Sequence, residues 1–325
     1  METIGIGIPT YDRGNLLKEL LDSLIEQVSE FNIPIFISDN NSSDDTEQIV
    51  KKFNLRYNNI TYNKNNTNLG VYGNILQVIK MMNTEYIWLI GDDDKLKDGS
   101  LREVMRLISE KHDFIVLNSK VFDREFKKIR WNRIIDCSGD RIYQNGEHNE
   151  LISDLRKASY FGFISSMIIK RILIDKIILK FDGNDFLLEG NIWLPTMMYY
   201  EAIVGHSGIF VCDPYVYDRS NVRITDKNAF EYMVIDKLRA LGYLANHGYD
   251  LATLRRCAEF GLLSAVSTTS IAKMHNPTIP VFNTFIKRSL ILPTYPKFIL
   301  FLLDHQPQLI VRMLFNIASK FRYSK

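Results

Sequence analysis

Three adjacent carboxylates, Asp92, Asp93 and Asp94, follow Gly91 and an apolar run from Tyr86 to Ile90. The run does not alternate with polar residues, which is typical of a strand buried on both faces. The carboxylates then lie where this strand leaves the sheet, the edge at which open α/β sheets bind ligands. Adjacent carboxylates repel one another unless a cation holds them, and Asp92 and Asp94 offer the hard oxygen ligands that Mn²⁺ or Mg²⁺ prefers. The alternative is a polar strand end followed by a helix cap.

Two more acidic turns follow predicted strands. Asp12 comes after the run from Ile4 to Pro9, and Asp39 comes after the run from Ile33 to Ser38. The carboxyl ends of parallel strands share one edge of a sheet, so these side chains and the triplet are expected on that edge. Turns favour Asp and Asn in any case. Three such turns, one of them carrying three carboxylates, favour a pocket for a nucleotide and a metal ion.

The elements that must position these residues alternate along the chain. Helical spacing of apolar residues covers 16–28, 49–53, 75–82 and 101–108, and short strands are predicted at 59–63 and 114–117. Such alternation over about the first 118 residues predicts an α/β fold with a mainly parallel sheet flanked by helices. Residues 119–160 are charged and aperiodic, and we expect them to form a variable excursion over the pocket. Strands at 160–170 and 208–212, a helix at 192–203, and helices from about 229 onward complete the prediction.

Composition restricts the class of protein. The chain has 325 residues, of which 46% are hydrophobic and 24% charged, as in soluble globular proteins, and its net charge of +2 gives no field that favours nucleic acid. The three cysteines, Cys137, Cys212 and Cys257, are odd in number and far apart. They suggest neither a disulfide framework nor a zinc site, and they fit a reducing compartment. No signal peptide or membrane-spanning run is visible in the sequence.

Four motifs in order resemble the family 2 glycosyltransferases with the GT-A fold. Residues 6–13 resemble the family's opening P-T-Y-N-R strand and turn, and residues 38–46 resemble its D-D-G-S-x-D-x-T element. Residues 68–74 resemble its N-x-G segment before a helix, and residues 92–94 fall where its D-x-D metal motif belongs. The sequence of residues 88–94 most resembles the corresponding segment of bacterial O-antigen and capsule sugar transferases, abequosyltransferase-like ones among them.

The resemblance implies a nucleoside diphosphate sugar donor, with UDP as the expected nucleotide. Mn²⁺ or Mg²⁺ held by Asp92 and Asp94 would then neutralise the leaving diphosphate. Asp39 would accept hydrogen bonds from the base, and Asp93 would contact ribose or the donor sugar; for Asp39 the alternative is a helix cap. The remaining donor-binding residues that the resemblance implies are Pro9, Thr10, Tyr11, Asp12, Arg13, Asn68, Gly70 and Asn74.

The catalytic base is less well marked. Family members that invert the anomeric centre use a carboxylate, often from an E-D pair before an aromatic-rich helix, and the matching stretch here has Glu189 beside Gly190. Glu189 is the first candidate and Asp185 the second, while a helix-start role for Glu189 is the alternative. The sequence leaves open whether the reaction inverts or retains configuration, because it does not show which group reaches the acceptor hydroxyl.

Two residues after this stretch resemble family positions. His206 lies where some GT-A enzymes have a third metal ligand, although a lone histidine is more often structural. Arg219, or Arg223, follows the last core strand and would contact the diphosphate in a bidentate manner. A solvated surface charge is the alternative for the arginines.

The predicted domains are a catalytic domain at 1–225 and a helical extension at 226–325. The catalytic domain divides into a nucleotide-sugar half at about 1–120 and an acceptor half at 121–225. Apolar clusters beside basic residues near the C-terminus suit an interfacial helix on an anionic membrane. The alternative is a helix packed on the catalytic domain or on a second copy of the chain.

The sequence thus predicts a metal-dependent glycosyltransferase of the hexosyl or deoxyhexosyl type in surface-polysaccharide assembly. Its acceptor would be a glycan or a polyprenyl-linked sugar, and its location the cytoplasm, at the inner face of the membrane if the C-terminal segment docks there. A nucleotidyltransferase is disfavoured, because the turn from Pro9 to Arg13 is not a glycine-rich, basic phosphate loop. The alternative of a non-catalytic sugar-nucleotide-binding or scaffold protein is kept, because Gly190 stands where the family's E-D pair has its aspartate.

Overall fold

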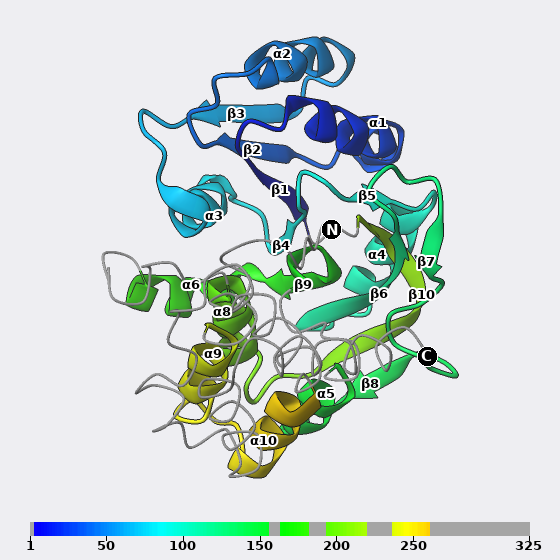
Figure 1. Cartoon of the computed structure of the whole chain (residues 1–325). Helices are drawn as coiled ribbons and strands as arrows, with labels where there is room; N and C mark the ends of the chain where they lie inside the picture. The colour runs from blue at the N-terminus through cyan, green and yellow to red at the C-terminus, as the bar shows by residue number, and fades with distance from the viewer. Residues whose placement is uncertain (1–2, 156–162, 182–192, 220–235, 261–325) are drawn as a thin grey trace, which may run out of the picture. The chain divides into compact units, whose positions relative to one another are not determined.

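The structure, a computed structural model, describes residues 3–155, 163–181, 193–219 and 236–260 (Figure 1). The chain divides into two compact units. The first comprises Met1–His148, Gly162–Gly190 and Leu194–Asn221, and the second comprises Asn149–Phe161, Asn191–Trp193 and Val222–Lys325. The division into domains at residue 225 stays a prediction.

The first unit is built on one sheet with the strand order β3-β2-β1-β4-β9-β6-β10-β5, in which β7 also pairs with β6 and β8 with β10. The strands are β1 (Ile4–Thr10), β2 (Ile35–Asp39), β3 (Ile60–Lys64), β4 (Tyr86–Leu89), β5 (Lys95–Leu96), β6 (Phe114–Phe122), β7 (Ile129–Trp131), β8 (Arg141–Tyr143), β9 (Met167–Lys170) and β10 (Gly208–Arg219). Its helices are α1 (Gly14–Phe31), α2 (Thr46–Arg56), α3 (Gly70–Met81), α4 (Ser100–Ser109), α6 (Arg171–Phe181) and α8 (Leu194–Ala202).

Strand β1 shows how the sequence separates the two faces of the sheet. Its isoleucines, Ile4, Ile6 and Ile8, are buried in one apolar cluster with residues of α1, α2 and α4, as the two-residue period of a strand requires. The residues between them are glycines because the other face is crowded. A Cβ on Gly7 would lie 2.8 Å from the Sδ of Met82 and 2.9 Å from Leu89. Helix α3 and Met82, the residue that follows it, therefore pack close to β1.

The parallel strands bring the predicted turns to one edge. β1 pairs in parallel with β2 and with β4, and Thr10 lies opposite Asp39 in this register. The carboxyl ends of all three strands thus meet where Asp92 to Asp94 begin. The predicted α/β class is confirmed, but the sheet is mixed. β9 runs antiparallel to both of its neighbours, β4 and β6.

Residues 119–155, the described part of the predicted excursion, form more regular structure than the sequence suggests. β6 continues to Phe122, and β7 and β8 add antiparallel partners to β6 and β10. β10 likewise continues to Arg219, past the predicted end at residue 212, because register shifts at Pro214 carry the pairing through that residue. Proline cannot donate to a ladder, so a bulge at this position is where it is tolerated.

The cysteine prediction is wrong. Cys137 and Cys212 form a disulfide, with their Cα atoms 5.9 Å apart, and among the described residues Cys257 is a buried free thiol. Seventy-five positions separate the two half-cystines, so only the tertiary path brings them together. Asn118 helps to fix that path, because its Nδ2 donates to the carbonyl oxygens of Ile135 and Cys212 at 2.7 and 3.0 Å. The argument from cysteines for a reducing compartment is therefore removed.

Reduction of this disulfide is expected to lower the free energy of unfolding by about 2–4 kcal/mol, because closing so long a loop restricts the unfolded chain. The measurement is thermal unfolding with and without a phosphine reductant. The double variant Cys137→Ser/Cys212→Ser is the control, since its melting temperature should not respond to reductant. Non-reducing peptide mapping that finds both thiols free would contradict the prediction.

The described part of the second unit is helical, which the sequence predicts only for residues from about 229 onward. It contains most of α5 (His148–Leu155) together with α9 (Lys237–Leu244) and α10 (Leu251–Phe260). The apolar sides of α9 and α10 are buried, and the Sγ of Cys257 lies 3.8 Å from the carbonyl oxygen of Ile152. Within the described ranges, no helix is long and apolar enough to cross a membrane. The predicted interfacial segment lies outside those ranges.

Candidate active site

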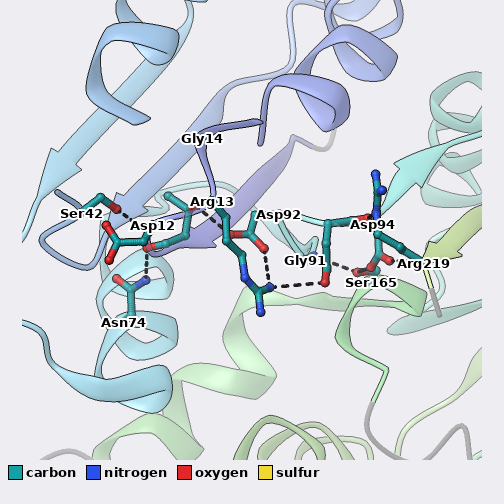
Figure 2. Close-up of polar contacts among 12 residues, drawn as sticks. Asp12, Arg13, Gly14, Ser42, Asn74, Gly91, Asp92, Asp94, Ser165 and Arg219 are labelled. Carbon is teal, nitrogen blue, oxygen red and sulfur yellow. Dashed lines mark hydrogen bonds and ion pairs between the residues drawn. The ribbon is translucent and has the colours of Figure 1, made fainter. Parts of the chain in front are cut away.

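The carboxylate triplet begins two residues after Ile90, whose N–H donates to the carbonyl oxygen of Gly7 at 2.9 Å. Asp92 is held from the β1 side (Figure 2). The Thr10 hydroxyl donates to its Oδ2 at 2.8 Å, and Arg13 Nη1 donates to its Oδ1 at 3.1 Å. Only 6% of the Asp92 side chain is exposed, whereas 51% of the Arg13 side chain is. One turn thus supplies both a fixed hydroxyl and a partly exposed cation to the same carboxylate.

Asp93 is the most accessible member of the triplet. Its Oδ2 lies 3.3 Å from the same Arg13 Nη1 that contacts Asp92, and its side chain is 20% exposed. One nitrogen therefore lies between carboxylate oxygens from two adjacent residues. Asp93 and Asp92 thus share a single cation, the guanidinium of Arg13, at the carboxyl edge of the sheet.

Asp94 points into the protein. Its Oδ2 accepts a 2.5 Å hydrogen bond from the Ser165 hydroxyl, and its Oδ1 accepts one of 3.3 Å from the backbone N–H of Arg219. Ser165 also accepts from the N–H of Gly91 at 2.9 Å, so it clamps both ends of the turn (Figure 2). The carboxylate of Asp94 is consequently occupied by structural partners.

Burial and mutual repulsion disfavour full ionisation of this cluster. Burial raises the pKa of Asp92 to about 6, with Asp93 adding to the shift and Arg13 and Thr10 opposing it. Burial, then the charges of Asp93 and Asp218, raise the pKa of Asp94 well above its usual value. Burial and the charge of Asp93 also raise the pKa of Asp218 to about 7. A bound cation would relieve these costs.

Arg219 does not present its guanidinium to solvent. Nε donates to the carbonyl oxygen of Asp93 at 2.9 Å, Nη1 to that of Arg124 at 2.5 Å, and Nη2 to Glu19 Oε2 at 2.8 Å. The side chain is 5% exposed and lies over the ring of Phe126. With each nitrogen engaged, Arg219 fixes the end of β10 to the acidic turn, and its burial disfavours the expected bidentate contact with a diphosphate.

Asp12 joins two of the turns at this edge (Figure 2). Its backbone is left-handed, with φ of 48°, and its Oδ1 accepts from the N–H of Ser43 at 2.7 Å while its own N–H donates to Ser42 Oγ at 2.9 Å. The hydrogen bonds that the carboxylate accepts from Ser43, the one from the backbone first, lower the pKa of Asp12. Asp44 makes a similar connection, since its Oδ2 accepts from the N–H of Gly14 at 2.8 Å. Asp12 is therefore placed at the predicted edge with its carboxylate already hydrogen-bonded.

Asp39 ends β2 as predicted, but it is fully buried. Its Oδ1 accepts from the N–H of Ser42 at 2.8 Å and its Oδ2 from the Tyr62 hydroxyl at 2.5 Å. Burial, then the hydrogen bond and charge of Asp39, raise the pKa of Tyr62 above its usual value. The carboxylate stabilises the turn after β2, and a nucleotide base that contacts Asp39 would share these oxygens with Ser42 and Tyr62.

The asparagines of the third motif form a network behind these turns. Asn74 is buried; its Nδ2 donates to the carbonyl oxygens of Thr10 and Ser38 at 3.2 and 3.0 Å, and its Oδ1 accepts from Ser38 Oγ at 2.7 Å. Asn68 Oδ1 accepts from the N–H of Gly70, whose φ of 72° suits glycine. Asn74 therefore ties the ends of β1 and β2 together, which is a positioning contact rather than a ligand contact. Exposed side chains nearby are Tyr11, Leu69 and Val71.

His206 is not brought to the triplet, which corrects its expected role as a metal ligand beside Asp92 and Asp94. It precedes β10, and its Nδ1 lies 3.3 Å from Asp113 Oδ2, just before β6. The acidic turn contacts the other end of β10, at Arg219.

Asp185 and Glu189 lie outside the described residues, as does Arg223. Over the ranges that the structure covers, no cluster of three or more His, Cys, Asp or Glu side chains is arranged to hold a metal ion.

Several residues of the site carry no signal in the sequence. Ser165 sits in a short 3₁₀ turn before the antiparallel strand β9, and its neighbours resemble no motif. Tyr62 and Glu19 face the site only because β3 and α1 place them there. Asp218 lies near the end of β10, and an acidic residue at a strand end is the signal that the sequence offers for it.

Comparison with known proteins identifies the family and the fold of the chain. The model of the family described as glycosyl transferase family 2 matches residues 6–177, more than half of the chain. The chain resembles the solved structure of TarS 1-349 of S. aureus in complex with UDP-GlcNAc, with a TM-score of 0.62 over 99% of this chain and 93% of that one. At 15% identity, this likeness shows the fold alone. The chain belongs to glycosyl transferase family 2, which confirms the resemblance found in its motifs.

Two curated relatives are bacterial transferases. Abequosyltransferase RfbV of Salmonella typhimurium is 33% identical over 178 residues, which cover 52% of this chain and 53% of that protein. GalNAc(5)-diNAcBac-PP-undecaprenol beta-1,3-glucosyltransferase of Campylobacter jejuni is 26% identical over 195 residues, covering 60% of this chain and 59% of that protein. The matched segment thus spans little more than half the length of either relative.

Proposed function

We propose that the protein transfers a sugar from a nucleoside diphosphate sugar to a hydroxyl group of a glycan or lipid-linked acceptor, with the help of a divalent metal ion. The observation that carries this proposal is the convergence of Asp92 Oδ1 and Asp93 Oδ2 on one cationic nitrogen, Arg13 Nη1, at 3.1 and 3.3 Å. This pair lies at the carboxyl edge of the sheet, beside the turn after β1. Membership of the family supports the reaction class.

The residues present fit Mn²⁺ or Mg²⁺. Such ions are commonly held by one or two carboxylates together with substrate phosphates and water, so a three-residue protein cage is not required. Arg13 Nη1 stands in for the cation between Asp92 and Asp93. The geometry favours these two carboxylates over the Asp92–Asp94 pair, because Asp94 is occupied by Ser165 and by the N–H of Arg219. When bound, the ion would neutralise the charge that develops on the leaving diphosphate.

The chain's own residues prepare this site. The Thr10 hydroxyl fixes one oxygen of Asp92, and Asn74 in turn fixes the carbonyl of Thr10. Ser165 holds the turn by its contacts with Gly91 and Asp94. Because these groups are already hydrogen-bonded before a donor arrives, little reorganisation is needed at the moment of transfer. Arg13 is the partly exposed cation that can turn from the carboxylates toward an incoming diphosphate.

The finer assignments belong to the same proposal. UDP is the expected nucleotide, and TarS, which shares the fold, was solved with UDP-GlcNAc. A polyprenyl-linked acceptor is supported by the name of the Campylobacter jejuni relative, which contains PP-undecaprenol. A role in surface-polysaccharide assembly is part of the same proposal, and the sequence similarity to an abequosyltransferase supports it. A cytoplasmic location rests on the donor class alone. Glu189 and Asp185 remain the candidate bases.

The test is a panel of nucleoside diphosphate sugars incubated with the full chain, with and without Mn²⁺, and assayed for transfer or donor hydrolysis. We expect metal-dependent release of a nucleoside diphosphate from at least one donor. The second candidate is a non-catalytic sugar-nucleotide-binding protein. For such a protein, adding a donor would raise the melting temperature, but no nucleoside diphosphate would be released. Release of pyrophosphate from a nucleoside triphosphate instead would indicate a nucleotidyltransferase and contradict the proposal.

A further inference from the structure

The hairpin that joins β6 to β7 carries a concentrated positive charge. Four exposed cations, Arg124, Lys127, Lys128 and Arg130, lie within seven residues and are accompanied by one exposed acidic residue, Glu125. The turn has a defined shape, because Asp123 Oδ1 accepts from the backbone N–H groups of Lys127 and Lys128 at 2.7 and 3.1 Å. The cations therefore project from a fixed turn.

The strand that follows adds apolar surface to this charge. Ile129 is 50% exposed and Trp131 is 56% exposed, and every residue of β7 is exposed. β7 is an antiparallel partner of β6 and lies beside it in Figure 1. The hairpin thus carries two exposed apolar side chains next to four exposed cations in the sequence, and we call residues 124–131 the hairpin patch.

The hairpin patch is attached to the candidate active site. The ring of Phe126 lies 4.3 Å from the guanidinium carbon of Arg219 and 4.4 Å from Lys95 Nζ. Arg219 contacts the carbonyl oxygens of both Arg124 and Asp93. One arginine thus connects the base of the hairpin to the acidic turn, so whatever binds the patch lies beside the sheet edge where the donor is proposed to bind.

We propose that the hairpin patch docks the protein on an anionic membrane surface. Lys and Arg near such a surface are attracted to acidic headgroups, and tryptophan prefers the interface between headgroups and acyl chains. A polyanion would satisfy the cations but would leave Ile129 and Trp131 in water, whereas a bilayer provides an apolar phase for them. This inference goes beyond the proposed transfer reaction, and it concerns residues separate from the C-terminal segment considered above.

The experiment is sedimentation of the full chain with phosphatidylcholine vesicles, with and without phosphatidylglycerol. The variant Lys127→Gln/Lys128→Gln/Arg130→Gln is compared with Lys51→Gln/Lys52→Gln/Arg56→Gln, which removes the same charges from the exposed side of α2. We expect the hairpin variant to bind anionic vesicles about 100-fold more weakly, since each cation contributes about fivefold near such a surface. The α2 variant should bind like the unaltered protein.

Tryptophan fluorescence supplies a second readout. Trp88 and Trp193 are buried and Trp131 is the exposed one of the three tryptophans of the chain, so a blue shift on adding anionic vesicles reports on Trp131, and Trp131→Phe should abolish it. Equal sedimentation of the hairpin variant and the unaltered protein, or binding without a blue shift, would overturn the proposal. So would a hairpin variant that loses affinity for inorganic polyphosphate while vesicle binding is unchanged.

Discussion

Replacing Asp93 with asparagine is expected to slow sugar transfer by roughly 100- to 1,000-fold, with little change in melting temperature. The side chain is 20% exposed, and its Oδ2 shares Arg13 Nη1 with Asp92. Asparagine keeps the shape but removes the charge, so a divalent ion would lose one of its two anionic ligands. The measurements are the transfer rate as a function of Mn²⁺ concentration and Mn²⁺ binding in the presence of UDP, each with a melting curve.

Asp94→Asn is the matched control, because it separates the two possible ligand pairs. Asparagine can still accept the hydrogen bond of Ser165 Oγ, which the structure places on Asp94 Oδ2. We expect this variant to bind Mn²⁺ nearly as well as the unaltered protein does. If Asp94→Asn lost Mn²⁺ affinity while Asp93→Asn kept it, the Asp92–Asp94 pair suggested by the sequence would be the correct one.

Replacing Arg13 with glutamine is expected to raise the affinity for Mn²⁺ in the absence of nucleotide by about tenfold. The guanidinium now lies within 3.3 Å of both Asp92 and Asp93 and competes with a metal ion for their oxygens. Burial lowers the pKa of Arg13, but the charges of Asp92 and Asp93 outweigh this effect and raise the pKa overall. The guanidinium therefore stays charged beside the two carboxylates and does not release them by deprotonation. The measurement is Mn²⁺ titration followed by electron paramagnetic resonance, which does not depend on turnover.

Arg56→Gln provides the comparison. Arg56 Nη1 lies 3.1 Å from Asp22 Oδ1, and its side chain is 53% exposed, close to the 51% of Arg13. The same substitution there removes one cation from the chain but none from the acidic turn, so Mn²⁺ binding should not change. Unchanged or weaker Mn²⁺ binding by Arg13→Gln would contradict the view that Arg13 occupies the metal position.

The roles within the site follow from contacts that the sequence does not encode locally. Arg219 and Asn74 were both expected to bind the donor, because they occupy family motif positions. The structure shows the guanidinium of Arg219 bonded to Asp93, Arg124 and Glu19, and the amide of Asn74 bonded to the ends of two strands. A motif marks a position in the fold, and whether its side chain faces a ligand or a neighbouring strand depends on what packs against it.

The sequence by itself determined the alternating elements and the edge at which the acidic turns meet. Its apolar periodicity and β-branched runs specify strands and helices locally, and parallel strands must place their carboxyl ends together.

Only the tertiary structure decided which carboxylates share a cation. Strand β9 enters the sheet antiparallel and brings Ser165 to Asp94, while the turn after β1 brings Arg13 to Asp92 and Asp93. These partners lie about 70 to 80 positions from the triplet, and the disulfide spans 75. Separations of that size are closed by chain topology and packing, which no local pattern reports.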